Sequence, residues 1–134
     1  MVLEDIRRPI RKRMAEIDPV NLLQLIITDR DGVMVLKVGN DSQQHKLTKI
    51  EECLSRTPVS TYIVASDQLQ RMNLGANKTM ISTYGKVKVA HFDHSQLILT
   101  IIGTEKVLLG QMKALSESLE QLIEDIGKIV LKDE

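Results

Sequence analysis

LIITDRDGVMV, residues 25–35, is the stretch that decides how the sheet of this protein is built. An apolar run precedes its acidic centre, and a second apolar run starts directly after it, at Val33. The Asp-Gly pair between them is a strong turn signal, because glycine takes the positive φ that tight turns between antiparallel strands require. The stretch therefore predicts a β-hairpin with strands over residues 22–29 and 33–38. Its corner is formed by Asp29, Arg30, Asp31 and Gly32.

The same letters also allow a chemical interpretation of Asp29. An apolar strand that leads into Asp-x-Asp-Gly is how aspartate-nucleophile phosphatases of the haloacid dehalogenase type begin their catalytic loop. That chemistry needs a helix after the loop, further acidic residues that hold magnesium, and a parallel sheet. Here a second apolar strand follows at once, and no Asp-Asp or Gly-Asp pair occurs downstream. The hairpin is the favoured interpretation, and we expect no enzyme.

Composition excludes several other classes of function. The 134 residues suit one domain, and 18 basic residues balance 18 acidic ones, so the strong positive charge of a dedicated nucleic-acid binder is missing. Three aromatic residues are too few for a platform that stacks bases. Cys53 is alone, which excludes an internal disulfide and a cysteine-rich zinc site. The apolar runs are too short to span a bilayer, so we expect a cytosolic protein. No motif indicates a cofactor, and we expect none.

The three histidines give a weak metal signal. His91 and His94 do not share a strand face at their spacing, and only His45 remains as a third ligand. Solvated or turn histidines are favoured, and no metal is expected.

The spacing of apolar and turn residues outlines the remaining elements. The expected helices cover residues 4–17, 58–72 and 105–132, and the expected strands cover residues 22–29, 33–38, 78–84, 86–92 and 97–103. A polar connection fills residues 39–57, with a helical turn at 50–54, and Gly75 ends the middle helix. Tight turns make the strands mostly antiparallel, and the non-alternating last strand predicts cover on both faces. The predicted fold class is α/β, an α+β sandwich in one domain over residues 1–134.

Two amphipathic helices leave alternatives open. The basic run from Arg7 to Arg13 could lie against anionic lipid, but a solvated face on a helix that packs on the sheet is favoured. The last helix carries leucines and isoleucines at the heptad spacing of a coiled coil. Additional apolar residues widen that stripe, which favours packing on the protein's own sheet.

Three stretches carry a resemblance to a known family: TDRDGVMVLKV (28–38), ASDQLQRMNLGANKTMISTY (65–84) and LILTIIG (97–103). In this order they closely resemble the MEK-partner scaffold subunits of the late endosomal and lysosomal adaptor complex called Ragulator or LAMTOR. Those subunits belong to the roadblock / dynein light chain family. The resemblance extends over roughly residues 20–125.

The resemblance implies a roadblock fold with strand order 2-1-5-4-3, the middle helix on one face and the terminal helices on the other. Such proteins work as dimers in which the middle helices pack together and the third strands pair. The implied partner is a sister roadblock subunit, and a lipidated subunit tethers the pair to the cytosolic face of late endosomes and lysosomes. The assembly scaffolds MEK and ERK kinases and helps to activate the Rag GTPases upstream of mTOR complex 1. The alternative is a roadblock homodimer that regulates a small GTPase or serves dynein.

On this chain the implied interface falls on the middle helix and on the strand over residues 78–84. The strand supports this independently, because it lacks proline and carries little of the charge with which unpaired edge strands deter association. The expected partner contacts are Tyr62, Ala65, Ser66, Leu69, Met72, Asn73, Lys78, Thr79, Met80, Ile81, Ser82 and Tyr84.

Overall fold

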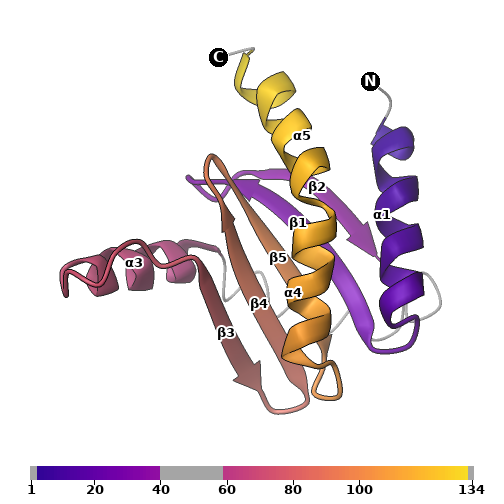
Figure 1. The fold of residues 1–134 in the computed structure, drawn as a ribbon, viewed down its shortest axis with the longest axis horizontal. Coiled ribbons are helices and arrows are strands. Elements are labelled where there is room, and N and C mark those ends of the chain that lie inside the picture. The colour runs from indigo at the N-terminus through magenta and orange to yellow at the C-terminus, as the bar shows by residue number, and fades with distance from the viewer. Residues whose placement is uncertain (1–2, 40–58, 133–134) are drawn as a thin grey trace.

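The computed structural model describes residues 3–39 and 59–132 (Figure 1). The expected helical turn at 50–54, His45 and Cys53 lie outside these ranges. In chain order the elements are α1 (Leu3–Ile17), β1 (Leu22–Asp29), β2 (Met34–Gly39), α3 (Val59–Gln70), β3 (Thr79–Tyr84), β4 (Val87–His94), β5 (Leu97–Thr104), α4 (Leu109–Ser118) and α5 (Glu120–Lys132).

The described strands form one sheet in the order β2-β1-β5-β4-β3, and every neighbouring pair is antiparallel. This confirms the expected order. The hairpin predicted from residues 25–35 pairs β1 with β2, and Ile26 of β1 lies between Lys37 of β2 and Thr100 of β5. Strands β1 and β5 are buried along nearly their whole length, which agrees with the expected cover on both faces.

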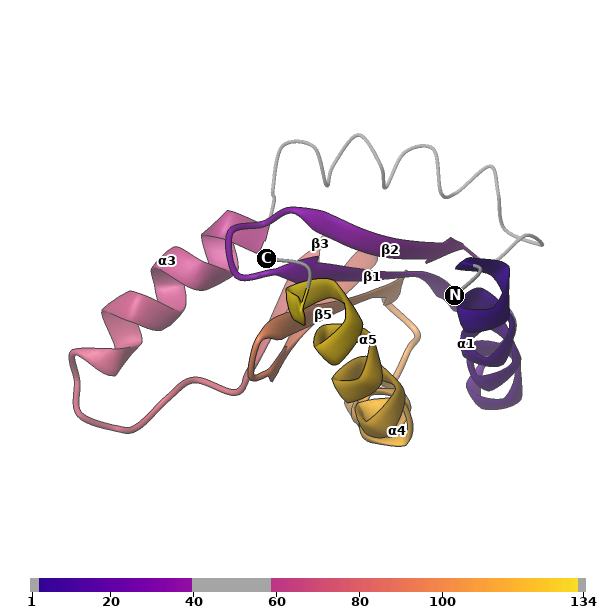
Figure 2. The same ribbon diagram turned by 90° about the horizontal axis from the view of Figure 1, so that it is seen from above.

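The terminal helices α1, α4 and α5 lie on one side of this sheet, and α3 projects beyond its edge (Figure 2). Alternate residues of a strand point to opposite faces, which separates the two cores. Leu97 and Leu99 face the side of α1, α4 and α5, whereas Ile98 faces α3 and packs with Val59 and Tyr62. The core under the terminal helices includes Ile6, Ile10, Met14, Leu25, Ile27, Leu36, Val38, Ala90, Phe92, Ile101, Met112, Leu115, Ile123 and Ile126.

The last helix differs from the continuous helix expected over residues 105–132. It consists of α4 and α5, which meet at Leu119 with φ −101° and ψ 2°. The amide of Ile123 still donates to the Leu119 carbonyl at 2.9 Å, so the apolar stripe continues across the break. Helix α4 begins at Leu109, later than the expected start at residue 105. At this end the Gln111 side chain accepts a hydrogen bond from the Leu108 amide at 2.9 Å. Apolar periodicity cannot detect a break that preserves the stripe.

The middle helix ends at Gln70, two residues before the expected end at Met72. After it the chain tightens, because the amides of Met72 and Asn73 donate to carbonyls three residues back, at 3.0 and 3.1 Å. Asn73 then takes φ 59° and Gly75 takes φ 92°, both in the left-handed region that ends helices. In Figure 1, α3 extends sideways beyond the β3 edge of the sheet.

Candidate functional site

The hairpin corner uses the Asp29 carboxylate as a hydrogen-bond acceptor. Its Oδ1 atom accepts from the amides of Asp31 and Val33, both at 2.9 Å. The Asp29 carbonyl also accepts from the Gly32 amide at 3.1 Å, and Gly32 takes φ 88°. These bonds close a turn, and accepting backbone amides in this way is the usual behaviour of an aspartate at a turn.

Arg30 joins this corner to the turn between β4 and β5. Its Nη1 atom lies 3.2 Å from Asp93 Oδ1 and donates to the Ser95 carbonyl at 2.7 Å. Asp93 Oδ1 in turn accepts from the Ser95 amide at 2.8 Å. Local sequence carries no signal for this contact, because it spans 63 positions of the chain.

The surface formed by α3, the turn after it and β3 is apolar and exposed; we call it the α3–β3 surface. Among the described strands, β3 is terminal in the sheet and pairs with β4 alone. The exposed apolar side chains of these elements, with their exposed fractions, are Val64 59%, Leu69 40%, Met72 62%, Leu74 78%, Ile81 37% and Tyr84 47%. Ile81 pairs with Ala90 and therefore points to the face of the terminal helices, opposite α3. Apolar side chains gathered beside an unpaired strand edge are typical of a protein–protein contact.

The residues expected at the interface divide into two groups. Those that the structure leaves exposed are Leu69, Met72, Asn73, Lys78, Thr79, Ile81 and Tyr84. Those that are half-buried are Ala65, Ser66, Met80 and Ser82. Sequence reasoning missed Val64 and Leu74, because neither lies on the apolar stripe from which the helix was identified. Both belong to the same exposed surface.

Tyr62 is the expected contact that is turned inward. It is 1% exposed, its hydroxyl donates to the Asn77 carbonyl at 3.2 Å, and burial raises its pKa. The Asn77 side chain donates to Ser66 Oγ at 3.1 Å. These contacts fasten the first half of α3 and the segment before β3 to each other. The Tyr62 side chain therefore positions the α3–β3 surface from beneath.

His91 lies next to Tyr62 on the same face of the sheet. It is buried, and its Nδ1 atom is 2.9 Å from Thr100 Oγ1. Burial lowers its pKa from 6.5 to about 4, so the imidazole is neutral at physiological pH. In residues 3–39 and 59–132, no three His, Cys, Asp or Glu side chains come together as a metal site.

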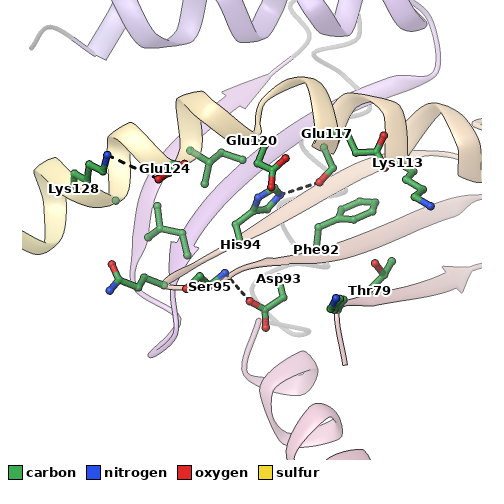
Figure 3. A pocket seen from close by; sticks show the side chains of 16 residues that line it. Thr79, Phe92, Asp93, His94, Ser95, Lys113, Glu117, Glu120, Glu124 and Lys128 are labelled. Carbon is green, nitrogen blue, oxygen red and sulfur yellow. Dashed lines mark hydrogen bonds and ion pairs between the residues drawn. The ribbon is translucent and has the colours of Figure 1, made fainter. Parts of the chain in front are cut away.

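A groove of about 700 Å³ lies on the opposite side of the sheet, between the β4–β5 turn and α4–α5 (Figure 3). His94 points from the end of β4 toward these helices, and its Nε2 atom is 2.8 Å from Ser116 Oγ. Burial lowers the His94 pKa, while Glu120 and Asp93 act to raise it. Ser116 is only 4% exposed inside α4, and this pair ties the turn to the helix.

Comparison with protein families and relatives identifies the chain. Residues 4–130 match the family described as mitogen-activated protein kinase kinase 1 interacting. The mouse (Mus musculus) protein named Ragulator complex protein LAMTOR3 is 30% identical over 127 residues, which are 95% of this chain and 96% of that protein. The Drosophila melanogaster protein named Ragulator complex protein LAMTOR3 homolog is 31% identical over the same shares of both chains.

Solved structures support the same fold. Myxococcus xanthus MglB superimposes with a TM-score of 0.64 at 14% identity, over 92% of this chain and 91% of that one. A Roadblock/LC7 domain from Streptomyces avermitilis gives a TM-score of 0.54 at 12% identity, over 85% and 97%. At such identities the likeness concerns the fold alone, and it confirms the roadblock fold expected from the sequence. The chain has this fold and belongs to the mitogen-activated protein kinase kinase 1 interacting family.

Proposed function

We propose that this protein is a non-enzymatic scaffold subunit of a Ragulator-type complex, and that it forms a heterodimer with a sister roadblock subunit. The names of its relatives support membership of such a complex. The observation that carries the dimer is the unpaired β3 edge, which stands beside exposed apolar side chains of α3 and the following turn.

The α3–β3 surface has what a partner strand and helix need. Strand pairing would satisfy the free backbone groups of β3, and helix packing would cover Leu69 and Met72, which are 40% and 62% exposed. A stable contact of standard size buries about 1,600 Å² in total, which requires α3 and β3 to act together. The burial of Tyr62 and its hydrogen bond to the Asn77 carbonyl hold α3 and β3 in place for such a contact.

In this proposal the dimer supports MEK and ERK signalling and the activation of Rag GTPases and mTOR complex 1. It reaches the cytosolic face of late endosomes and lysosomes through a lipidated partner. None of the described helices is long and apolar enough to pass through a bilayer. In α1, Arg13 lies 3.2 Å from Glu16, which reduces the charge that the basic run offers to anionic lipid.

The experiment is co-expression with a sister roadblock subunit, followed by native mass spectrometry. A one-to-one heterodimer that persists at dilution is the expected result. A homodimer that ignores every sister subunit would instead favour a homodimeric regulator of a small GTPase or a dynein-associated role. The purified chain should not bind anionic vesicles tightly at physiological salt, and tight binding would contradict recruitment through partners.

A further inference from the structure

The groove between the β4–β5 turn and α4–α5 lies on the helix side of the sheet, whereas α3 packs on the opposite face. Its volume of about 700 Å³ lies in the range of ligand-binding pockets. From residue 113 to residue 128, its helical wall is about 22 Å long at 1.5 Å per residue. An extended peptide of about seven residues has the same length.

Gly127 keeps one end of this groove open. It is buried inside α5, a position where glycine is less favourable than any residue except proline. A Cβ atom at this position would meet only the Leu97 side chain, at 3.7 Å, which is an ordinary van der Waals distance. Packing therefore does not require glycine here. What the glycine provides is space above Leu97, on the apolar floor of the groove.

The helical wall of the groove is acidic in its middle. Glu117, Glu120 and Glu124 follow one another along it, with Lys113 and Lys128 at its two ends (Figure 3). Glu124 lies 3.9 Å from Lys128 and is partly neutralised within the chain.

Asp93, across the groove, is likewise paired with Arg30, at 3.2 Å. Among the described residues, neither Glu117 nor Glu120 has a salt-bridge partner. Glu117 of α4 and Glu120 of α5 both line the groove. The acidic centre of the groove therefore presents two carboxylates to the same ligand.

We propose that this groove binds a peptide segment of a partner protein in which a lysine or arginine stands between apolar residues. The cation would lie between Glu117 and Glu120, where it replaces the missing ion pair. An apolar neighbour would fill the space that Gly127 leaves above Leu97. This docking site lies on the opposite face of the sheet from α3, and it adjoins the start of β3 through Lys78 and Thr79.

The test uses the full chain, alone and with a sister roadblock subunit, and two fluorescent heptapeptides. One alternates leucine with arginine and the other alternates leucine with glutamate. Anisotropy should show binding of the basic peptide and none of the acidic one. Glu117→Gln with Glu120→Gln should weaken binding by about fivefold, since exposed ion pairs are individually modest. Glu105→Gln, outside the groove, is the matched control and should change nothing.

A steric variant tests the floor of the groove. Gly127→Leu should weaken binding of the basic peptide by at least about tenfold. Gly110→Leu is its control. Gly110 lies in α4 and does not line the groove, and a Cβ atom added there would meet no other side chain within 4 Å. Thermal melts show whether each variant folds. If Gly127→Leu does not fold, binding by the Glu117→Gln, Glu120→Gln variant tests the proposal.

Amide chemical shifts locate the bound peptide. They should change at residues 94–97 and along the helical wall, and Leu69→Asp in α3, outside the groove, should leave them as they are. The proposal is overturned if both peptides bind equally, if the glutamate variants bind like the native chain, or if the shifts fall on α3 instead of the groove.

Discussion

Tyr62 and His91 lie against each other, with ring centroids 5.2 Å apart and 28° between the ring planes. Tyr62 comes from α3 and His91 from β4, and their side chains are 1% and 7% exposed. The stack therefore joins the middle helix to the sheet, directly beneath the surface proposed to receive the partner. Two predictions concern this junction.

Acid is expected to destabilise the protein through His91. Its pKa falls from 6.5 to about 4 on folding, so between these pH values the unfolded chain binds a proton that the folded chain does not. The free energy of unfolding should therefore be unaffected above about pH 6.5 and decrease by about 3 kcal/mol as the pH falls toward 4. Urea unfolding at a series of pH values measures this.

The control for this titration is His91→Gln, which removes the ionisable ring. His94 remains, and burial lowers its pKa in the same direction, so some acid sensitivity should persist. The variant should nevertheless lose most of the decrease. An unchanged profile of stability against pH would assign the effect to another group.

Removing the Tyr62 side chain should loosen α3. Tyr62→Ala is expected to lower the free energy of unfolding by about 3 to 5 kcal/mol, as for other buried aromatic residues. Tyr62→Phe loses only the hydrogen bond to the Asn77 carbonyl and should cost about 1 kcal/mol. Partner binding measured by calorimetry should weaken more for alanine than for phenylalanine. Equal binding by both variants would show that α3 does not need this anchor.

The hairpin corner gives a ranking of two substitutions. Gly32→Val places a β-branched residue at φ 88° and should destabilise the fold by about 1 to 3 kcal/mol. Asp29→Asn should change stability little, because the amide oxygen can accept the same bonds from Asp31 and Val33. Thermal melts and pull-downs compare them. If Asp29→Asn abolished function while the melting temperature stayed unchanged, Asp29 would have a direct functional role and would not be only a turn residue.

A charge introduced on β3 should weaken binding of the sister subunit without destabilising the isolated chain. Ile81→Asp, at a side chain that is 37% exposed, should leave the melting temperature of the isolated chain nearly unchanged and abolish co-purification with the sister subunit. Val33→Asp is the matched control, since Val33 is 61% exposed on the hairpin and away from β3. Met80→Asp is less informative, because Met80 packs against the cluster of Tyr62 and Ile98. Heterodimer formation by Ile81→Asp would argue against the β3 edge.

Much of the sheet could be predicted because its signals are local. The Asp-Gly corner and the uninterrupted apolar run of β5 each report on a few neighbouring residues, and both gave the observed elements. The helix ends were predicted less accurately, since the turn at Asn73 and the break at Leu119 depend on backbone angles that the spacing of apolar residues does not encode.

The candidate sites depend on contacts that no local pattern contains. Tyr62 lies on the helical stripe that was expected to face the partner, yet the stripe's first half covers the protein's own sheet. The groove is formed where the β4–β5 turn meets α4 and α5, and the space above Leu97 depends on Gly127, whose surroundings no local pattern indicates.

The two borders of the sheet are unequal. Along β2, helix α1 packs beside the strand, and Arg7 Nε donates to the Lys37 carbonyl at 3.1 Å, so a side chain already occupies backbone that another strand would use. Along β3 the backbone has no such cover among the described residues. One side-chain bond thus covers part of the β2 edge, whereas the described part of the chain leaves the β3 edge open. A dimer formed through β3 would carry β2 at both of its ends, where this bond disfavours the addition of a third chain.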